Sequence, residues 1–279
     1  MGVFIDPSTD WGFKRIFGDK ELLINFLNSL LEGERVITDL RYMNNERLAK
    51  QKEERKVIYD LYCETDTGEH IIVEMQKRLQ EHFKDRTLFY SACSIVEQGI
   101  QGNWDYKLTP VYGVFFLNFR LDTENSDYFC KDVSLVEKYT GKVFSDKLRH
   151  IYIELPRFVK TKADCDSIFE YWIYNLTNMK DLNEISFKER NAIFSRLEEI
   201  ASRANLSKEE RAQYEYEWKI NNDFFNCVDY AEKKGRQEGI AEGEQRKNLE
   251  NAKKMKDKGS SLDFIADITG LTIEEIEKL

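Results

Sequence analysis

The chain has 279 residues, 41% of them hydrophobic and 33% charged, which is enough for one ample domain with an appendage and too apolar for a disordered protein. The net charge of −9 argues against a general nucleic-acid binder, although an enzyme could still bind DNA through a local basic strip. No apolar run approaches the roughly 20 residues that cross a bilayer, and the first residues lack a secretory apolar segment, so we expect a cytoplasmic protein with no membrane partner.

The five cysteines and three histidines form no metal-binding or disulfide pattern. The cysteines are widely spaced, without a CxxC pair or a nearby histidine, and the histidines have no ligand spacing. We therefore expect free thiols and no zinc site. The sequence also lacks a phosphate-binding P-loop, a dinucleotide glycine pattern and a serine nucleophile elbow.

A short helix is expected at the N-terminus, over Asp10–Phe17. Ser8 or Thr9 can cap its start, and Gly18 can end it. Asp10 would lie in the first helical turn, where a carboxylate helps to satisfy free backbone amides.

A second helix should follow at once. Asp19 can cap it, and Leu22–Leu31 supplies its apolar stripe. The β-branched segment Val36–Met43 is then expected to be a first strand.

The most informative segment is Val57–Arg78, whose composition is that of two strands joined by a tight turn. The turn has three residues and ends at Gly68, which suits the left-handed position of a known hairpin connection. With Thr67 at the apex of the turn, Asp60 faces Glu74 on the neighbouring strand.

The two faces of this hairpin differ, because side chains alternate along a strand. The polar face carries Asp60, Glu74, Gln76 and Arg78. The other face is apolar and is expected to face the core, with Val57, Tyr59, Leu61, Cys63, Ile71, Val73 and Met75. Like charges on facing positions repel, so two acids held together favour a cation or a shared proton, and Mg²⁺ prefers such oxygen ligands. The alternative is a solvated polar face, and a slip of one residue would separate the acids.

A long helix is expected over His82–Gly102. Its partial apolar pattern consists of Phe83, Leu88, Phe89, Ala92 and Val96. Arg86 and Tyr90 are one turn apart and would face a cleft together. Arg86 is then either a phosphate contact or an ordinary surface arginine.

The remaining elements are a buried strand over residues 111–119, a strand over residues 151–155 that ends before Pro156, and a series of helices. The helices are expected over residues 168–179, 187–203 and 208–230. Aromatic residues in this part, such as Trp172, are interpreted as packing groups.

The C-terminal segment 229–258 should be a charged helical arm. Gly235, Gly239 and Gly243 recur at four-residue spacing, and a glycine costs about 1 kcal/mol inside a helix. The arm is either a surface for self-pairing into a homodimer or a linker that frays. Residues 262–279 resemble a helix-turn-helix fragment whose second helix is too acidic for DNA, which favours a packing cap.

Asp60 followed by Glu74-x-Gln76 resembles the Asp…(Asp/Glu)-x-Lys signature of PD-(D/E)xK nucleases, with glutamine in place of lysine. The wider chain is similar to recombination-promoting nucleases, also called PD-(D/E)xK family transposases. The stretches that carry the similarity are DPSTDWGFKRIFG, LLINFLNSLL, IVEMQKR and FKDRTLFYSACSIVEQGIQG. It is strongest between Asp6 and Phe119.

This resemblance implies an α/β, restriction-endonuclease-like core, with a mixed central sheet flanked by helices and a helical C-terminal extension. The core would span residues 1–160, a helical completion residues 161–228, and the arm with its cap residues 229–279. The implied activity is that of a Mg²⁺- or Mn²⁺-dependent DNA endonuclease, linked to recombination or transposition. The alternatives are a non-enzymatic interaction protein on the same scaffold and an RNA-directed hydrolase.

The resemblance also implies roles for individual residues. Asp60 and Glu74 would bind the metal, with Asp10 as a candidate third acid, and Gln76 would position the attacking water. The residues expected to contact DNA are Arg78, Arg86 and Lys84.

Overall fold

The computed structural model describes residues 2–44, 46–47, 57–99, 102–122 and 128–279. Contacts between residues divide the chain into two compact units, Met1–Glu217 and Trp218–Leu279. The boundary falls inside one long helix, α6 (Lys208–Asp257), which begins in the first unit and continues into the second.

In the described part of the chain, six strands of the first unit form one mixed sheet in the order β1-β4-β5-β6-β8-β7. Their bounds are β1 Leu40–Tyr42, β4 Leu61–Thr65, β5 His70–Gln76, β6 Val111–Leu117, β7 Cys130–Val136 and β8 Val143–Glu154. The central strands β5, β6 and β8 run parallel, and the outer pairings are antiparallel. Two short strands, β2 (Glu46–Arg47) and β3 (Val57–Ile58), pair separately. The predicted α/β core with a mixed sheet is confirmed.

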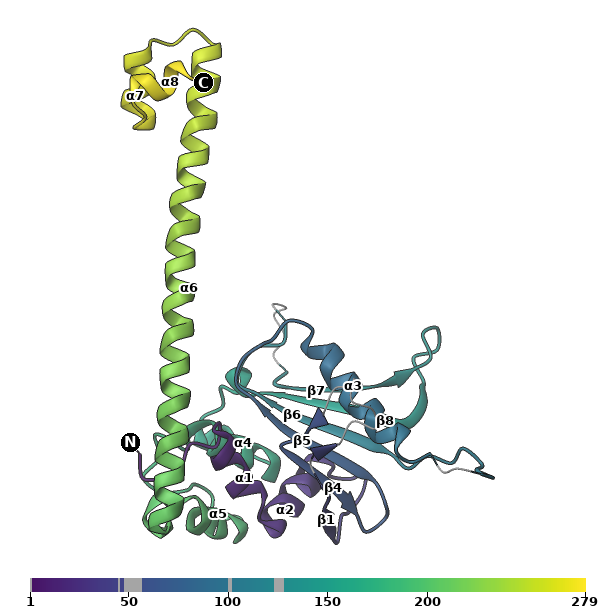
Figure 1. Cartoon of the computed structure of the whole chain (residues 1–279). Coiled ribbons are helices and arrows are strands. Elements are labelled where there is room, and N and C mark those ends of the chain that lie inside the picture. Colours follow the sequence, from purple (N-terminus) through teal and green to yellow (C-terminus); the bar gives the residue numbers. More distant parts are fainter. Residues whose placement is uncertain (1, 45, 48–56, 100–101, 123–127) are drawn as a thin grey trace. The chain divides into compact units, whose positions relative to one another are not determined.

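Helices cover both faces of this sheet (Figure 1). One face carries α1 (Asp10–Phe17), α2 (Lys20–Leu30), α4 (Ile168–Asn178) and α5 (Ile193–Ala201), and the other carries α3 (Phe83–Val96). On the first face, the Phe116 ring of β6 lies 5.1–5.5 Å, between ring centroids, from Phe13, Phe17 and Phe26. This aromatic core fixes α1 and α2 against the centre of the sheet.

The predicted helix starts at the N-terminus are confirmed. Thr9 caps α1 by accepting a hydrogen bond from the Gly12 N–H, and Asp19 caps α2 by accepting one from the Leu22 N–H. Gly18 ends α1, as expected. The first helix is therefore held at both ends, with Asp10 as its first residue.

Helix α3 packs on the sheet through polar side chains. Its inner face carries Thr87, Ser91 and Ser94, whereas the apolar residues of the predicted pattern point outward, with Leu88 50% and Val96 70% exposed. Only Phe83 of that pattern is buried. Side chains of the sheet hydrogen-bond these buried hydroxyls, so the polar side of the helix can face the sheet and the apolar side can face outward.

Several elements differ from expectation in extent. β1 begins only at Leu40, because the Asn28 side chain hydrogen-bonds both the N–H and the C=O of Ile37 and takes the place of a strand partner there. β7 and the first half of β8 were not expected, since their side chains are largely exposed and lack an apolar alternation. α5 is shorter than the helix expected over residues 187–203.

Short 3-10 helices cover Leu155–Arg157, Lys162–Asp164 and Arg203–Asn205. The first of them contains Pro156 and follows β8 directly, so the strand ends where the proline was expected to end it.

The second unit contains most of α6, followed by α7 (Leu262–Thr269) and α8 (Ile273–Glu277). Ala252 of α6, Ile265 of α7 and Ile276 of α8 form its buried core. α6 is continuous through its three glycines. No helix in the described residues is long and apolar enough to cross a membrane.

Candidate functional site

The hairpin of β4 and β5 holds Asp60 and Glu74 side by side. Leu61 pairs with Val73, so Asp60, one residue before β4, falls opposite Glu74 of β5. The turn is closed by a hydrogen bond of 2.9 Å from the Thr65 N–H to the Glu69 C=O. Gly68 has a φ of +87°, the left-handed conformation that favours glycine. The predicted register is therefore confirmed.

Three hydrogen bonds join the two acids to each other's strand and to Gln76. The Asp60 N–H donates to Glu74 Oε1 at 3.1 Å, and the Met75 N–H donates to Asp60 Oδ2 at 2.8 Å. The Gln76 amide Nε2 donates to Glu74 Oε2 at 3.0 Å. The second oxygen of Asp60, Oδ1, accepts no hydrogen bond from the residues that the structure describes. It is thus left for another partner.

In this position both carboxyls are weaker acids than usual. Burial raises the pKa of Asp60 to about 6, and the charge of Asp10 contributes. Burial also raises the pKa of Glu74, which is only 3% exposed, to about 8, and the charge of Asp60 contributes. A cation between the two groups would offset both effects. An oxygen pair of this kind fits a divalent metal ion, for which carboxylates are ordinary ligands.

Arg86 of α3 supplies positive charge to the pair. Its attraction lowers the pKa of both carboxyls and partly offsets the effect of their burial. The guanidinium lies over the rings of Phe83 and Tyr90, 5.6 Å from each centroid, and donates to Gln80 Oε1 at 2.6 Å. The expected proximity of Arg86 and Tyr90 is confirmed.

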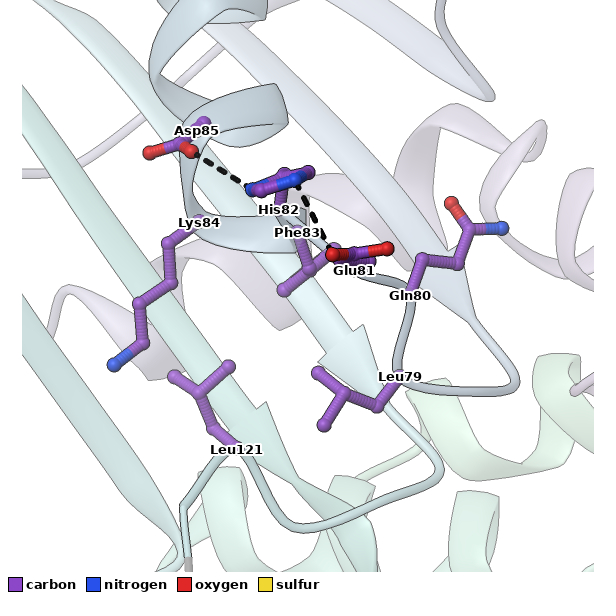
Figure 2. A pocket seen from close by; sticks show the side chains of 8 residues that line it. All are labelled: Leu79, Gln80, Glu81, His82, Phe83, Lys84, Asp85 and Leu121. Carbon is purple, nitrogen blue, oxygen red and sulfur yellow. Dashed lines mark ion pairs between the residues drawn. The ribbon is translucent and has the colours of Figure 1, made fainter.

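Lys84, another candidate DNA contact, is exposed on α3, and neither acid of the pair lines its pocket. It lines a pocket at the start of α3 (Figure 2), where its side chain lies near Leu121 and Gln80 forms the opposite side. His82 sits between Glu81 and Asp85 in the same pocket, with its ring nitrogens 3.5 and 3.6 Å from their oxygens. Gln80, which bonds Arg86, connects this pocket with the site.

Arg78 lies beyond the end of β5, in a bend, so the strand alternation does not extend to it. Lys77, immediately before it, is partly buried. Burial lowers the pKa of Lys77, while the acids Asp6, Asp10 and Glu217 attract its charge.

Asp10 is half-exposed at the start of α1 and lies close enough to raise the pKa of Asp60 by its charge. Both its oxygens contact the ammonium of Lys14, at 2.8 and 3.0 Å. Thr9, not Asp10, caps the helix with its side chain. Within the described residues, no group of three or more His, Cys, Asp or Glu is arranged to hold a metal ion. Asp10 therefore contacts Lys14 beside the pair, and its role as a third metal ligand stays a prediction.

Lys14 was missed by the sequence reasoning. Burial pushes its pKa down, but the hydrogen bond to Asp10 and the charges of Asp10, Asp60 and Glu217 raise it above the ordinary value. The available signal was its position four residues after Asp10, the spacing of a helical ion pair.

One expectation for the hairpin was wrong. Tyr59 does not share the face of Cys63: its ring stacks on Tyr62 at 5.2 Å and its hydroxyl donates to the Tyr90 C=O. The chain bends at Asp60, between β3 and β4, which interrupts the alternation. The predicted side-chain position of Val57 lies outside the described residues. Tyr62 and Ile72, on the same face as Glu74, pack against Tyr90 and Cys93 of α3, and Glu74 itself is buried, so this face is not fully solvated.

One of three comparisons with known proteins found a match. A family model of the PD-(D/E)XK nuclease family transposases matches residues 7–231 of the chain. The chain belongs to this family. The matched range includes every candidate site residue of this transposase-family chain and nearly all of its first unit. Comparisons with curated proteins and with solved structures found no match.

Proposed function

We propose that the chain is a metal-dependent DNA endonuclease, in which Asp60 and Glu74 hold Mg²⁺ or Mn²⁺. The observation that carries this proposal is the buried carboxylate pair, held by backbone hydrogen bonds and left with a spare oxygen on Asp60. Membership of the nuclease family supports a DNA substrate and a role in recombination or transposition. The free thiols agree with a cytoplasmic location.

A bound divalent ion would polarise a phosphodiester and lower the pKa of a water molecule. The residues of the chain would do the positioning. The Gln76 amide group is fixed by its bond to Glu74, which leaves its carbonyl oxygen to orient the attacking water. Gln76 cannot take the proton, so that proton would leave to solvent or to the phosphate. Arg86 would stabilise the negative charge that develops on the phosphate.

Arg78 and Lys84 are proposed to contact the DNA backbone on either side of the reacting phosphate. Arg78 follows β5 directly, and Lys84 lines the pocket that Gln80 connects to Arg86. Because the whole chain is acidic, this local basic strip would have to supply most of the attraction for DNA.

Cleavage of a supercoiled plasmid in Mg²⁺ or Mn²⁺ tests the proposal. We expect wild-type protein to nick the plasmid and Glu74→Gln to lower the rate on the order of 100-fold or more, because the ion loses a charged ligand. Glu64→Gln is the matched control. Glu64 lies on the same hairpin, bonds Arg41 at 2.6 Å and pairs with His70 near the turn. This variant should cut at the wild-type rate.

An Asp60→Ala variant that cuts as fast as wild type would refute the assignment of the site. A plasmid that stays intact, with divalent-ion binding retained, would instead favour the non-enzymatic interaction protein.

We also propose that the arm formed by α6 pairs with a second copy of the chain. In the described structure nothing lies within 4 Å of the positions that a Cβ atom would occupy on Gly235, Gly239 or Gly243. Ile220 and Ile240 of the same helix are exposed apolar residues. A glycine face open to close approach supports self-pairing.

A further inference from the structure

Two cations act on Asp60 from different helices. Arg86 belongs to α3, and Lys14 belongs to α1 on the other face of the sheet. The two differ in what they contact. Arg86 rests on aromatic rings and Gln80, whereas Lys14 is bound directly to a carboxylate of the site, that of Asp10.

The Lys14 ammonium occupies both oxygens of Asp10, at 2.8 and 3.0 Å. The ammonium neutralises this carboxylate and competes with a metal ion for its oxygens. Lys77 also feels the charge of Asp10, but Lys14 is the lysine whose ammonium is in direct contact with that carboxylate. Lys14 is therefore the cation that neutralises Asp10 in the metal-free protein.

The contact between Lys14 and Asp10 is easily exchanged. Both side chains are at least one-third exposed, and an exposed pair at this helical spacing changes an equilibrium by only about twofold. Both residues line an open pocket, whose other lining residues are Trp11, Arg15, Glu210, Gln213 and Glu217. The long Lys14 side chain consequently has free space in which to move once Asp10 is taken by another cation.

We propose that Lys14 is the internal counter-ion of this acidic site. Its ammonium holds Asp10 while no divalent ion is bound, then yields that carboxylate to the ion and binds a phosphate oxygen of the DNA. This inference rests on the proposed function, since it requires an ion at Asp60 and Glu74. Lys14 is a positioning residue for Asp10 before the ion arrives, and a substrate contact afterwards.

Titration with Mn²⁺ in the absence of DNA provides the test. We expect Lys14→Met to lower the dissociation constant of Mn²⁺ about two- to fourfold, because it removes a competitor for Asp10 that is worth about twofold and a nearby positive charge that is worth less than about twofold. In an Asp10→Asn background the same substitution should change it less than about twofold. Lys20→Met is the matched control, because Lys20 is also an ion-paired helical lysine, bound to Asp39 of another part of the surface. It should leave Mn²⁺ affinity unchanged.

DNA binding in Ca²⁺ gives a second readout. Lys14→Met should reduce the slope of log affinity against log salt by about one phosphate contact, and Lys20→Met should not. Thermal melting of each variant checks that it is folded.

Equal tightening by Lys14→Met in the Asp10→Asn background would mean simple charge repulsion and would overturn the proposal. An unchanged Mn²⁺ affinity in Lys14→Met, with binding lost in Glu74→Gln, would overturn it too while leaving the endonuclease proposal standing. Mn²⁺ binding that survives Glu74→Gln would mean that the proposed function itself has failed.

Discussion

The acids at the centre of the site are held in a place that disfavours their charge. Burial removes hydration from both groups, the charge of Asp10 acts on Asp60 and the charge of Asp60 acts on Glu74, so the pKa values of Asp60 and Glu74 rise to about 6 and about 8. In the unfolded chain both carboxyls would titrate near pH 4. Between about pH 4 and about pH 8 the folded, metal-free protein therefore binds more protons than the unfolded chain. By linkage, the stability contributed by these groups is complete at low pH and falls as the pH rises through the folded pKa values.

Urea unfolding in a chelator tests this at the residue scale. The free energy of unfolding of wild-type protein should fall between about pH 5 and about pH 8, and each unit by which a pKa is raised corresponds to about 1.4 kcal/mol. Glu74→Gln removes the more strongly shifted group and should flatten this dependence. Glu64→Gln should keep the wild-type slope. A Glu74→Gln protein with the same slope as wild type would show that the pair is not protonated in this range.

At the scale of elements, α3 is the unusual feature. Its buried hydroxyls bond groups on the sheet: Ser91 Oγ lies 2.8 Å from His150 Nε2, and Thr87 Oγ1 lies 2.8 Å from the Tyr152 hydroxyl. Burial lowers the pKa of His150 to about 4, so the ring is neutral near pH 7 and can take part in such a bond. The position of Arg86, whose charge acts on both carboxyls, thus depends on polar contacts between α3 and the sheet.

We expect Ser91→Val to destabilise the protein by about 1–3 kcal/mol, because it leaves a nitrogen of His150 buried without its partner. Leu88→Ser lies on the same helix but on its exposed side, and should change stability by less than about 0.5 kcal/mol. Denaturant unfolding of the two variants measures the difference. If Leu88→Ser instead destabilised the protein more than Ser91→Val, the outer face of α3 would be the one that packs on the sheet.

The hairpin and its acid pair were predictable because turn chemistry and strand alternation fix a register locally. Asp60 and Glu74 were paired correctly from Gly68 and the apex alone. β6 was equally clear, because every one of its residues is buried and apolar enough to read as a central strand.

The elements that were missed depend on contacts between distant residues. Burial of the polar face of α3 is favourable only when His150 and Tyr152 lie opposite it to form hydrogen bonds, and those residues are distant in the sequence. β7 is a largely exposed edge strand without an apolar pattern, so its pairing with β8 leaves little local trace. Lys14 was overlooked since its importance comes from Asp60, which only the fold brings near it.

At the scale of the whole molecule, the chain consists of two units that share α6. The sequence predicted divisions after residues 160 and 228, and these stay predictions. The matched family range, residues 7–231, ends within α6, so the last part of the arm and its cap lie outside it. The second unit has its own small core around Ala252, Ile265 and Ile276. The second unit therefore has buried apolar contacts of its own.

Sedimentation of the full-length protein tests the proposed pairing of arms. We expect wild-type protein to sediment as a dimer and Gly239→Leu as a monomer, because a large side chain blocks close approach of two helices. Gln237→Leu adds the same side chain to the opposite side of α6 and should leave the dimer intact. Monomeric wild-type protein at micromolar concentration would dispose of the pairing.

The length of the turn at Gly68 controls the position of residues that lie far from the turn. It sets which residues of two strands meet, and the acids sit at the far end of the hairpin. A change of one residue in loop length would move one acid to the opposite side of the sheet without altering either acid. Insertions and deletions in this loop, more than substitutions, are therefore the changes expected to separate Asp60 from Glu74 while the fold is kept.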